Sequence, residues 1–246
     1  MDHMLYVGMT GARAMQLAQA TNANNLANAS TSGFRADFHQ LMAETVTGPG
    51  LATRVNAVAG ERASQLQAGP IQQTGRELDV AITGEGWLAV QDGQGKEAYS
   101  RRGDLQITVT GQLLNGAGQP VLGENGPVSI PPHSSLTIGR DGSVSVIPLG
   151  QGADTLAVVD RIKLVTLDQS QVIKGNDGLM RQQDDKPGEV SAAIGLQSGS
   201  LEGSNVNTVD AMVNMISLSR SYEMQVKMMQ TAKDMADTGT RLMRLE

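Results

Sequence analysis

The last 42 residues, 205–246, constrain the fold of this chain most strongly. They contain no proline and one glycine, Gly239, and their apolar residues recur with the 3.6-residue period of an amphipathic helix. Asn207 is placed to cap the start of this helix, and Arg241 and Arg244 lie near the negative end of its dipole. A helix of this length spans about 60 Å, so we expect it to need packing partners along its whole length.

Glycine, proline and methionine divide the chain into three parts. All 8 prolines lie between residues 49 and 187, and 26 of the 29 glycines lie between residues 33 and 203. Conversely, 11 of the 13 methionines fall in residues 1–15 or 212–243. Because glycine and proline interrupt helices, this distribution predicts two helical ends around a glycine-rich middle that is not helical.

The N-terminal end also shows helical spacing. Residues 2–30 are predicted to form a helix with Asp2 as its cap, ending where Gly33 suits a left-handed position. Its seam residues follow a 3-4 spacing: Leu5, Gly8, Ala12, Met15, Gln19, Asn22 and Leu26. The small residues of this seam would allow a second helix to approach closely. An ordinary amphipathic helix, without coiled-coil packing, is the alternative.

The middle of the chain changes period. Residues 45–75 show weak periodicity, and residues 33–75 are predicted to be an extended connector. Residues 76–203 contain many short β-type runs separated by turn pairs such as Asp141-Gly142, which indicates an all-β domain.

The expected fold class is therefore α+β. Residues 1–32 and 204–246 are expected to form a coiled-coil-like axial domain from the two ends of the chain, with the all-β domain inserted between them. One pair of long helices cannot cover an apolar face as wide as that of residues 212–218, so the sequence also favours assembly with further copies.

Composition excludes several classes of function. The chain carries 19 Lys and Arg against 25 Asp and Glu, a formal net charge of -6, and no basic block for nucleic acid. No apolar run is long enough to span a membrane, so we expect no membrane insertion, and the start does not have the pattern of a cleaved secretory signal. There is no cysteine, which excludes disulfide and thiolate chemistry.

No motif indicates a catalytic, metal or cofactor site. The Gly84-Glu85-Gly86-Trp87 segment matches part of a dinucleotide fingerprint, but a strand and a turn follow it where the fingerprint needs a helix. The three histidines, His3, His39 and His133, are isolated from one another and from other ligand residues.

Four segments in order along the chain resemble the bacterial flagellar rod and hook proteins. They are residues 24–35, 77–87, 99–104 and 199–223. The motif residues that carry the resemblance at the two ends are Asn24, Asn25, Leu26, Asn28, Gly33, Phe34 and Asn205. Trp87 stands where phenylalanine is common in that family, an apolar replacement that leaves the expected β core in place.

The resemblance implies a structural subunit of the flagellar basal-body rod rather than an enzyme. The length and the opening residues favour the proximal rod, with the distal rod as the alternative and a cell-wall hydrolase as a more remote one. Such subunits form a helical tube with copies of themselves and other rod proteins and transmit torque. They are exported by the flagellar type III apparatus without a cleaved signal, and they assemble as a rod in the periplasm.

The resemblance also gives the terminal helices a role. We expect their packing, within and between subunits, to use Leu5, Ala12, Met15, Leu26, Val209, Met212, Ile216, Tyr222, Val226 and Met229. The motif asparagines Asn24, Asn25 and Asn28 either bond across the helix junction to the connector or cap the helix end and contact solvent.

Overall fold

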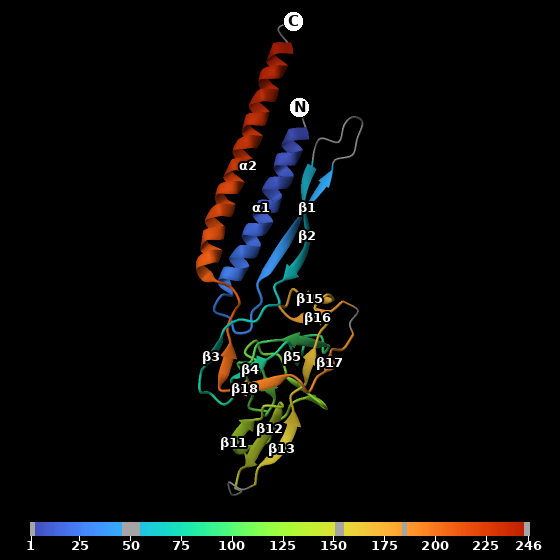
Figure 1. The fold of residues 1–246 in the computed structure, drawn as a ribbon, viewed down its shortest axis with the longest axis vertical. Helices are drawn as coiled ribbons and strands as arrows, with labels where there is room; N and C mark the ends of the chain where they lie inside the picture. The colour runs from blue at the N-terminus through green and yellow to red at the C-terminus, as the bar shows by residue number, and fades with distance from the viewer. Residues whose placement is uncertain (1–2, 46–54, 151–154, 184–185, 244–246) are drawn as a thin grey trace. The chain divides into compact units, whose positions relative to one another are not determined.

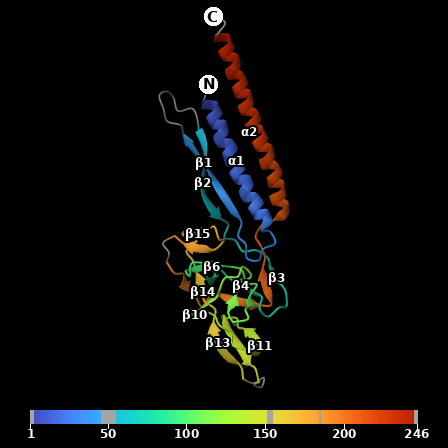
Figure 2. The same cartoon turned by 180° about the vertical axis from the view of Figure 1, so that it is seen from behind.

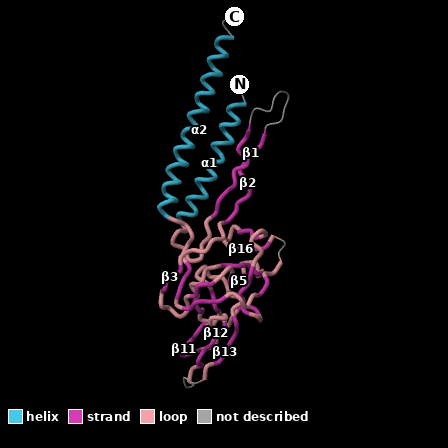
Figure 3. The backbone as a smooth tube through the Cα atoms, viewed as in Figure 1, coloured by secondary structure: helices cyan, strands magenta, loops and turns pink. Residues whose placement is uncertain are grey.

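The computed structural model describes residues 3–45, 55–150, 155–183 and 186–243. The chain divides into two compact units. The helical unit comprises residues 1–29, 36–65 and 206–246, and the β unit comprises residues 30–35 and 66–205. Figure 3 shows that both helices belong to the helical unit, whereas the β unit consists of strands and loops. The predicted α+β fold class, with helical chain ends and a β-rich middle, is confirmed.

Two helices and one β-hairpin build the helical unit. They are α1 (His3–Ala27), α2 (Thr208–Met243), β1 (Asp37–Thr45) and β2 (Val55–Ser64). The two helices lie side by side in both views, with the hairpin along α1 (Figures 1 and 2). They run antiparallel, because Gly8 lies against Met229 near one end of the pair, while Asn22 donates a hydrogen bond to the carbonyl of Ala211 near the other.

The termini of the helices follow from local chemistry. The side chain of Asn207 accepts hydrogen bonds from the backbone N–H groups of Val209 and Asp210, so the predicted cap of α2 is present. Helix α1 ends at Ala27, earlier than the predicted residue 30, because a turn begins at Asn28. Arg241 lies in the last turn of α2 as predicted, whereas Asp2 and Arg244 lie outside the described residues.

The structure pairs two strands within the predicted extended connector. Strands β1 and β2 run antiparallel with Asp37 opposite Ser64 and Thr45 opposite Val55, and a bulge interrupts the register near His39. The sequence signal for this hairpin is weak because its apolar residues do not alternate with polar ones, and most side chains of β1 are exposed. The exposed large apolar side chains of the hairpin are Phe38, Leu41, Met42, Val55 and Val58.

A six-stranded antiparallel sheet is the largest element of the β unit. Its order is β15-β16-β6-β5-β14-β17. The strands are β5 (Trp87–Gln91), β6 (Glu97–Ser100), β14 (Leu164–Thr166), β15 (Val172–Lys174), β16 (Met180–Gln182) and β17 (Glu189–Val190).

Smaller sheets complete the β unit. One sheet has three strands: β11 (His133–Ile138), β12 (Ser143–Pro148) and β13 (Ala157–Arg161). The other strands form pairs: β3 (Ile71–Gln73) with β19 (Ser200–Glu202), β4 (Val80–Thr83) with β18 (Gly195–Ser198), β7 (Gln106–Ile107) with β8 (Leu113–Leu114), and β9 (Leu122–Gly123) with β10 (Gly126–Pro127).

Strand β5 separates two hydrophobic clusters. Its Leu88 and Val90 belong to the larger cluster, and Trp87 and Ala89 belong to the smaller one on the other face. This alternation is the period of two expected of a strand, and here both faces are buried. Residues 87–91, which lie inside the predicted all-β domain, therefore form the central strand of the core.

Replacing Leu88 by alanine should destabilise the β unit strongly. Leu88 is fully buried, so Leu88→Ala leaves a cavity and is expected to cost about 2–5 kcal/mol of unfolding free energy. Leu156→Ala is the matched control, since Leu156 is 60% exposed. Trp87 is the one tryptophan of the chain, so its fluorescence during urea unfolding reports on this unit. Equal midpoints for the two variants would contradict the assigned core.

Candidate functional site

Three buried charged side chains meet in the β unit. The carboxylate of Glu202 accepts a hydrogen bond from Arg35 Nη2 at 2.5 Å through Oε1 and one from Arg101 Nη1 at 3.0 Å through Oε2. The Glu202 side chain is 1% exposed, and those of the two arginines are 1% and 5% exposed. We refer to Arg35, Arg101 and Glu202 as the ion-pair node.

The node holds two positive charges against one negative charge. The ring of Trp87 stabilises the excess positive charge through cation–π contacts. The guanidinium carbons of Arg35 and Arg101 lie 5.8 and 5.4 Å from the centre of this ring. The Nε atoms of both arginines are buried and have no hydrogen-bond acceptor among the described residues. Burial lowers the pKa of Arg35, and the charge of Glu202 opposes that effect.

The node connects segments that are far apart in the sequence. Arg35 follows the first helix, Arg101 follows strand β6, and Glu202 ends strand β19. Glu202 Oε1 also accepts a hydrogen bond from the backbone N–H of Gly69 at 2.9 Å. One carboxylate therefore holds together four stretches of the β unit, including those that continue into the helical unit along the chain.

The N-terminal and C-terminal motif residues meet at this node. The N–H of Gly33 donates to the carbonyl of Glu202 at 2.8 Å, and the N–H of Asn205 donates to the carbonyl of Phe34 at 3.3 Å. Gly33 has a φ of 65°, and a Cβ added there would lie 2.4 Å from the backbone of Arg101. Both the positive φ and the close approach require glycine at this position.

Phe34 is fixed by a cation. The Nζ atom of Lys174 lies 4.0 Å from the centre of the Phe34 ring and donates to the carbonyl of Arg35 at 2.8 Å. Asn205 also donates through Nδ2 to the carbonyl of Gln67 at 3.1 Å. The motif residues Phe34 and Asn205 thus hold backbone segments around the ion-pair node.

The motif asparagines at the end of α1 have different surroundings. Asn25 exchanges two hydrogen bonds with the backbone of Asp37, donating through Nδ2 at 2.7 Å and accepting through Oδ1 at 2.9 Å. This pair connects the last turn of α1 to the first residue of β1. Asn28 donates to the carbonyl of Asn24 at 3.0 Å at the helix end, and Asn24 is exposed.

Asp37 is a second buried acid, located in the helical unit. It is 3% exposed and accepts hydrogen bonds from Arg62 and, at 2.7 Å, from the hydroxyl of Ser64. Arg62 and Ser64 belong to β2. The Asp37 side chain therefore joins the two strands at the end of the hairpin farthest from its turn. Asn25 and Asp37 therefore attach the hairpin to α1.

The side of α2 that faces α1 has a regular spacing. Its less exposed residues are Ala211, Met215, Leu218, Tyr222, Gln225, Met229, Ala232 and Ala236. Gln16 donates to the Tyr222 hydroxyl at 3.2 Å, and a Cβ added at Gly8 would lie 2.8 Å from Met229. Glycine at position 8 therefore permits the close approach of the helices that the predicted seam indicates.

The predicted packing residues divide into two groups. Leu5, Ala12, Met15, Leu26, Tyr222, Val226 and Met229 are buried or half-buried in the helical unit. Val209, Met212 and Ile216 are 66, 55 and 56% exposed, and Val213 between them is 60% exposed. We call these four residues the α2 ridge. They lie on the side of α2 opposite Ala211, which is 5% exposed.

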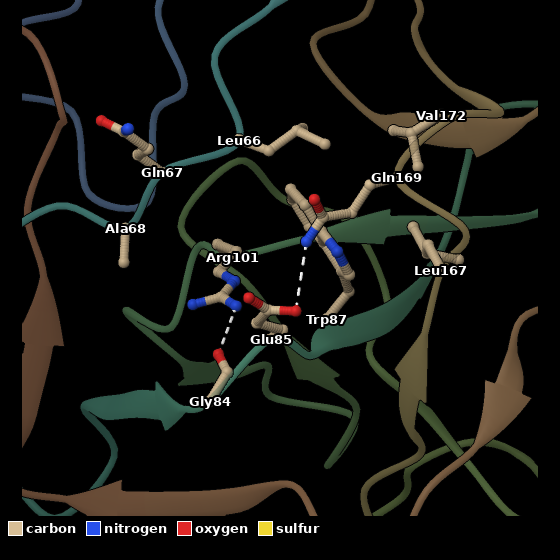
Figure 4. A pocket seen from close by; sticks show the side chains of 10 residues that line it. All are labelled: Leu66, Gln67, Ala68, Gly84, Glu85, Trp87, Arg101, Leu167, Gln169 and Val172. Atoms are coloured by element: carbon tan, nitrogen blue, oxygen red, sulfur yellow. Dashed lines mark hydrogen bonds between the residues drawn. The ribbon is translucent and has the colours of Figure 1, made fainter.

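A cavity of about 700 Å³ opens beside Trp87 (Figure 4). Glu85 and Gln169, which both line it, are joined by a hydrogen bond of 3.2 Å, and Arg101 donates to the carbonyl of Gly84 at 2.5 Å. Among the described residues that line it, Glu85 carries a carboxylate and Arg101 a guanidinium. Among the described residues, no three His, Asp or Glu side chains gather to bind a metal ion.

The node could not be assigned from the sequence, although its residues lie inside the recognised motifs. A charged residue in a motif is usually an exposed one, and neither pairing nor burial is visible without the fold. The available signal is that Arg35, Arg101 and Glu202 each stand beside a glycine-containing segment, where the backbone is closely packed.

Removing the charge of Glu202 should unfold the β unit readily. Glu202→Gln leaves two buried guanidinium groups without a carboxylate, so we expect a loss of about 3–5 kcal/mol of unfolding free energy. Glu124→Gln is the control, because Glu124 is 59% exposed in a long contact with Arg161, and we expect a change of less than about 1 kcal/mol. Tryptophan fluorescence during urea unfolding measures both, and a tolerant Glu202 would refute the role of the node.

Three family models match the chain in order. Residues 5–35 match the flagella basal body rod protein family, residues 81–146 match the flagellar hook protein FlgE/F/G D1 domain, and residues 197–242 match the flagellar basal body rod FlgEFG protein C-terminal family. All three matches fall on the segments that carry the motif residues, the core strand β5 and the two helices.

Relatives that align over nearly the whole chain are also flagellar basal-body rod proteins. The flagellar basal-body rod proteins FlgF of Escherichia coli and of Salmonella typhimurium are each 41% identical to the chain over 99% of both sequences. FlgG of Buchnera aphidicola is 33% identical over 97% of this chain and 98% of its own length. The chain belongs to the flagellar basal-body rod protein family, and within it resembles FlgF more than FlgG.

Proposed function

We propose that this chain, a structural subunit of the flagellar basal-body rod of the FlgF type, works mechanically by packing its helical unit into a tube that transmits torque. The observation that carries the proposal is the α2 ridge. Four large apolar side chains stand exposed on one face within two turns of a helix. A contiguous apolar face of this kind marks a contact surface, because exposing it to water is unfavourable.

The helical unit has other surfaces that ask for partners. Tyr6 and Met9 of α1 are 56 and 53% exposed, and Met224 and Met235 of α2 are 65 and 60% exposed. Methionine side chains adapt to irregular neighbours, which suits contacts with several non-identical subunits. We assign residues 1–32 and 204–246 to an inner axial domain with coiled-coil-like packing, joined by the connector 33–75 to an outer β domain of residues 76–203.

The two groups of packing residues receive separate roles in this proposal. Leu5, Met15, Tyr222, Val226 and Met229 hold the two helices of one subunit together. Val209, Met212 and Ile216 contact neighbouring subunits. The 3-4 spacing of the α1 seam and of the α1-facing side of α2 supports side-by-side helices of the coiled-coil type.

Partners and location follow from the family. The chain would assemble with copies of itself and other rod proteins in the periplasmic part of the basal body, after export by the flagellar type III apparatus without a cleaved signal. None of the described helices is long and apolar enough to cross a membrane. Helix α1 contains two glycines among its first 9 residues, Gly8 and Gly11, and glycine destabilises a helix. This composition supports an N-terminal helix that becomes ordered only when it packs against other helices.

A structural role is favoured over the alternatives. The higher identity to FlgF than to FlgG supports the proximal over the distal rod. The relatives are named as rod proteins, which supports a non-enzymatic subunit rather than a cell-wall hydrolase.

Placing a charge on the α2 ridge should block assembly. Ile216→Asp would bury a carboxylate in the subunit contact, so motility and recovery of the chain in purified basal bodies should fall to background. The β unit should stay folded, as judged by Trp87 fluorescence. Val109→Asp introduces the same charge at a fully exposed apolar residue of the β unit and should leave motility near wild type. Normal rods containing Ile216→Asp would refute the proposed contact.

A further inference from the structure

A groove runs between α1 and β2 in the helical unit. Its volume is about 660 Å³. The lining is mainly apolar and includes Leu17, which is 37% exposed, and Val58, which is 36% exposed. Its lining includes three residues with small side chains, Ala14, Ala20 and Ala57. Such a surface has room for larger side chains from another molecule.

One face of α1 forms the helical wall of this groove. Thr10, Arg13, Ala14, Leu17 and Ala20 follow the spacing i, i+3, i+4, i+7 and i+10, so they lie along one side of the helix. From the first to the last of them the wall is about 15 Å long. This is the geometry of a groove that accepts an amphipathic helix.

The α2 ridge has the complementary spacing. Val209, Met212, Val213 and Ile216 stand at i, i+3, i+4 and i+7 and cover about 10 Å of helix. This pattern is the set of anchors by which a helix docks into an apolar groove. The ridge is therefore short enough to lie within the groove.

Charge supports the same pairing. Arg13 lines the groove, and Asp210 lies in the first turn of α2 beside the ridge. Both side chains are exposed, and neither has an ion-pair partner among the described residues of the helical unit. A ridge seated in the groove would bring a carboxylate and a guanidinium to the rim of one apolar contact, where such a pair favours one orientation.

We propose that the α1–β2 groove of one subunit receives the α2 ridge of a second copy of this chain. The inference rests on the proposed function and specifies its contact. The groove and the ridge are different surfaces of one helical unit, so each copy can be donor and acceptor at the same time. Such a heterologous contact does not close on itself in a pair and continues from copy to copy around or along a tube.

The absence of cysteine makes this contact directly testable. Leu17→Cys marks the groove and Ile216→Cys marks the ridge. The two single variants are expressed together in motile cells, basal bodies are purified and oxidised, and disulfide-linked products are separated without reducing agent. We expect a dimer from the mixed single variants and a ladder of higher species when both substitutions are in one chain.

Matched controls define the result. Each single variant alone should remain monomeric, because groove and ridge thiols do not meet their own kind. Leu17→Cys combined with Lys227→Cys should give no dimer, since Lys227 is exposed on the ridge side of α2 about three turns beyond Ile216. A second pair, Val58→Cys with Val213→Cys, repeats the test if Ile216→Cys is not incorporated into rods.

The outcomes separate this inference from the proposed function. Incorporated variants without a cross-link in either pair would overturn the groove–ridge contact and leave the rod-subunit role standing. A disulfide-linked product with a different protein would overturn the choice of a second copy as occupant. If the unsubstituted chain is missing from purified basal bodies, the proposed function fails, and the inference fails with it.

Discussion

Glu202 is held at both carboxylate oxygens by arginines from distant parts of the chain. Burying three charges is costly, and that cost is offset by the ion pairs, by the ring of Trp87 and by backbone hydrogen bonds at Gly69 and Gly84. The node and the adjacent backbone hydrogen bonds join residues 33–35 to residues 202–205 of the β unit, and losing one partner would leave a buried charge unpaired. These segments lead to β1 and α2 along the chain, so the β unit depends on the node for the conformation of its own chain ends.

The helical unit follows a different principle, because it leaves apolar surface open. Asn25 and Asp37 fix the hairpin to α1, and the close approach at Gly8 fixes α1 to α2. The α2 ridge then remains exposed on the opposite side. The β unit is held together internally by buried ion pairs, whereas the helical unit exposes apolar side chains. This division suits a subunit in which one part folds by itself and the other part packs into an assembly.

The sequence predicts the parts of this structure that depend on hydrophobic periodicity and on capping and turn residues. The cap at Asn207, the buried strand at residues 87–91 and the glycine at position 33 follow from local rules. The hairpin β1–β2 and the pairing of Arg35 with Glu202 do not. The hairpin lacks a clean alternation of apolar and polar residues, since the neighbours Leu41 and Met42 are both apolar and both exposed. The ion pair joins residues whose proximity only the complete fold decides. For the same reason, the ridge residues could be predicted as packing residues, but not as the ones left uncovered within a single chain.

We propose that the α2 ridge is a subunit contact of the rod. Helical reconstruction of purified basal bodies, with density assigned to this chain, tests it most directly. We expect Val209, Met212, Val213 and Ile216 to be buried against a neighbouring subunit. A reconstruction in which these side chains face solvent would contradict this contact.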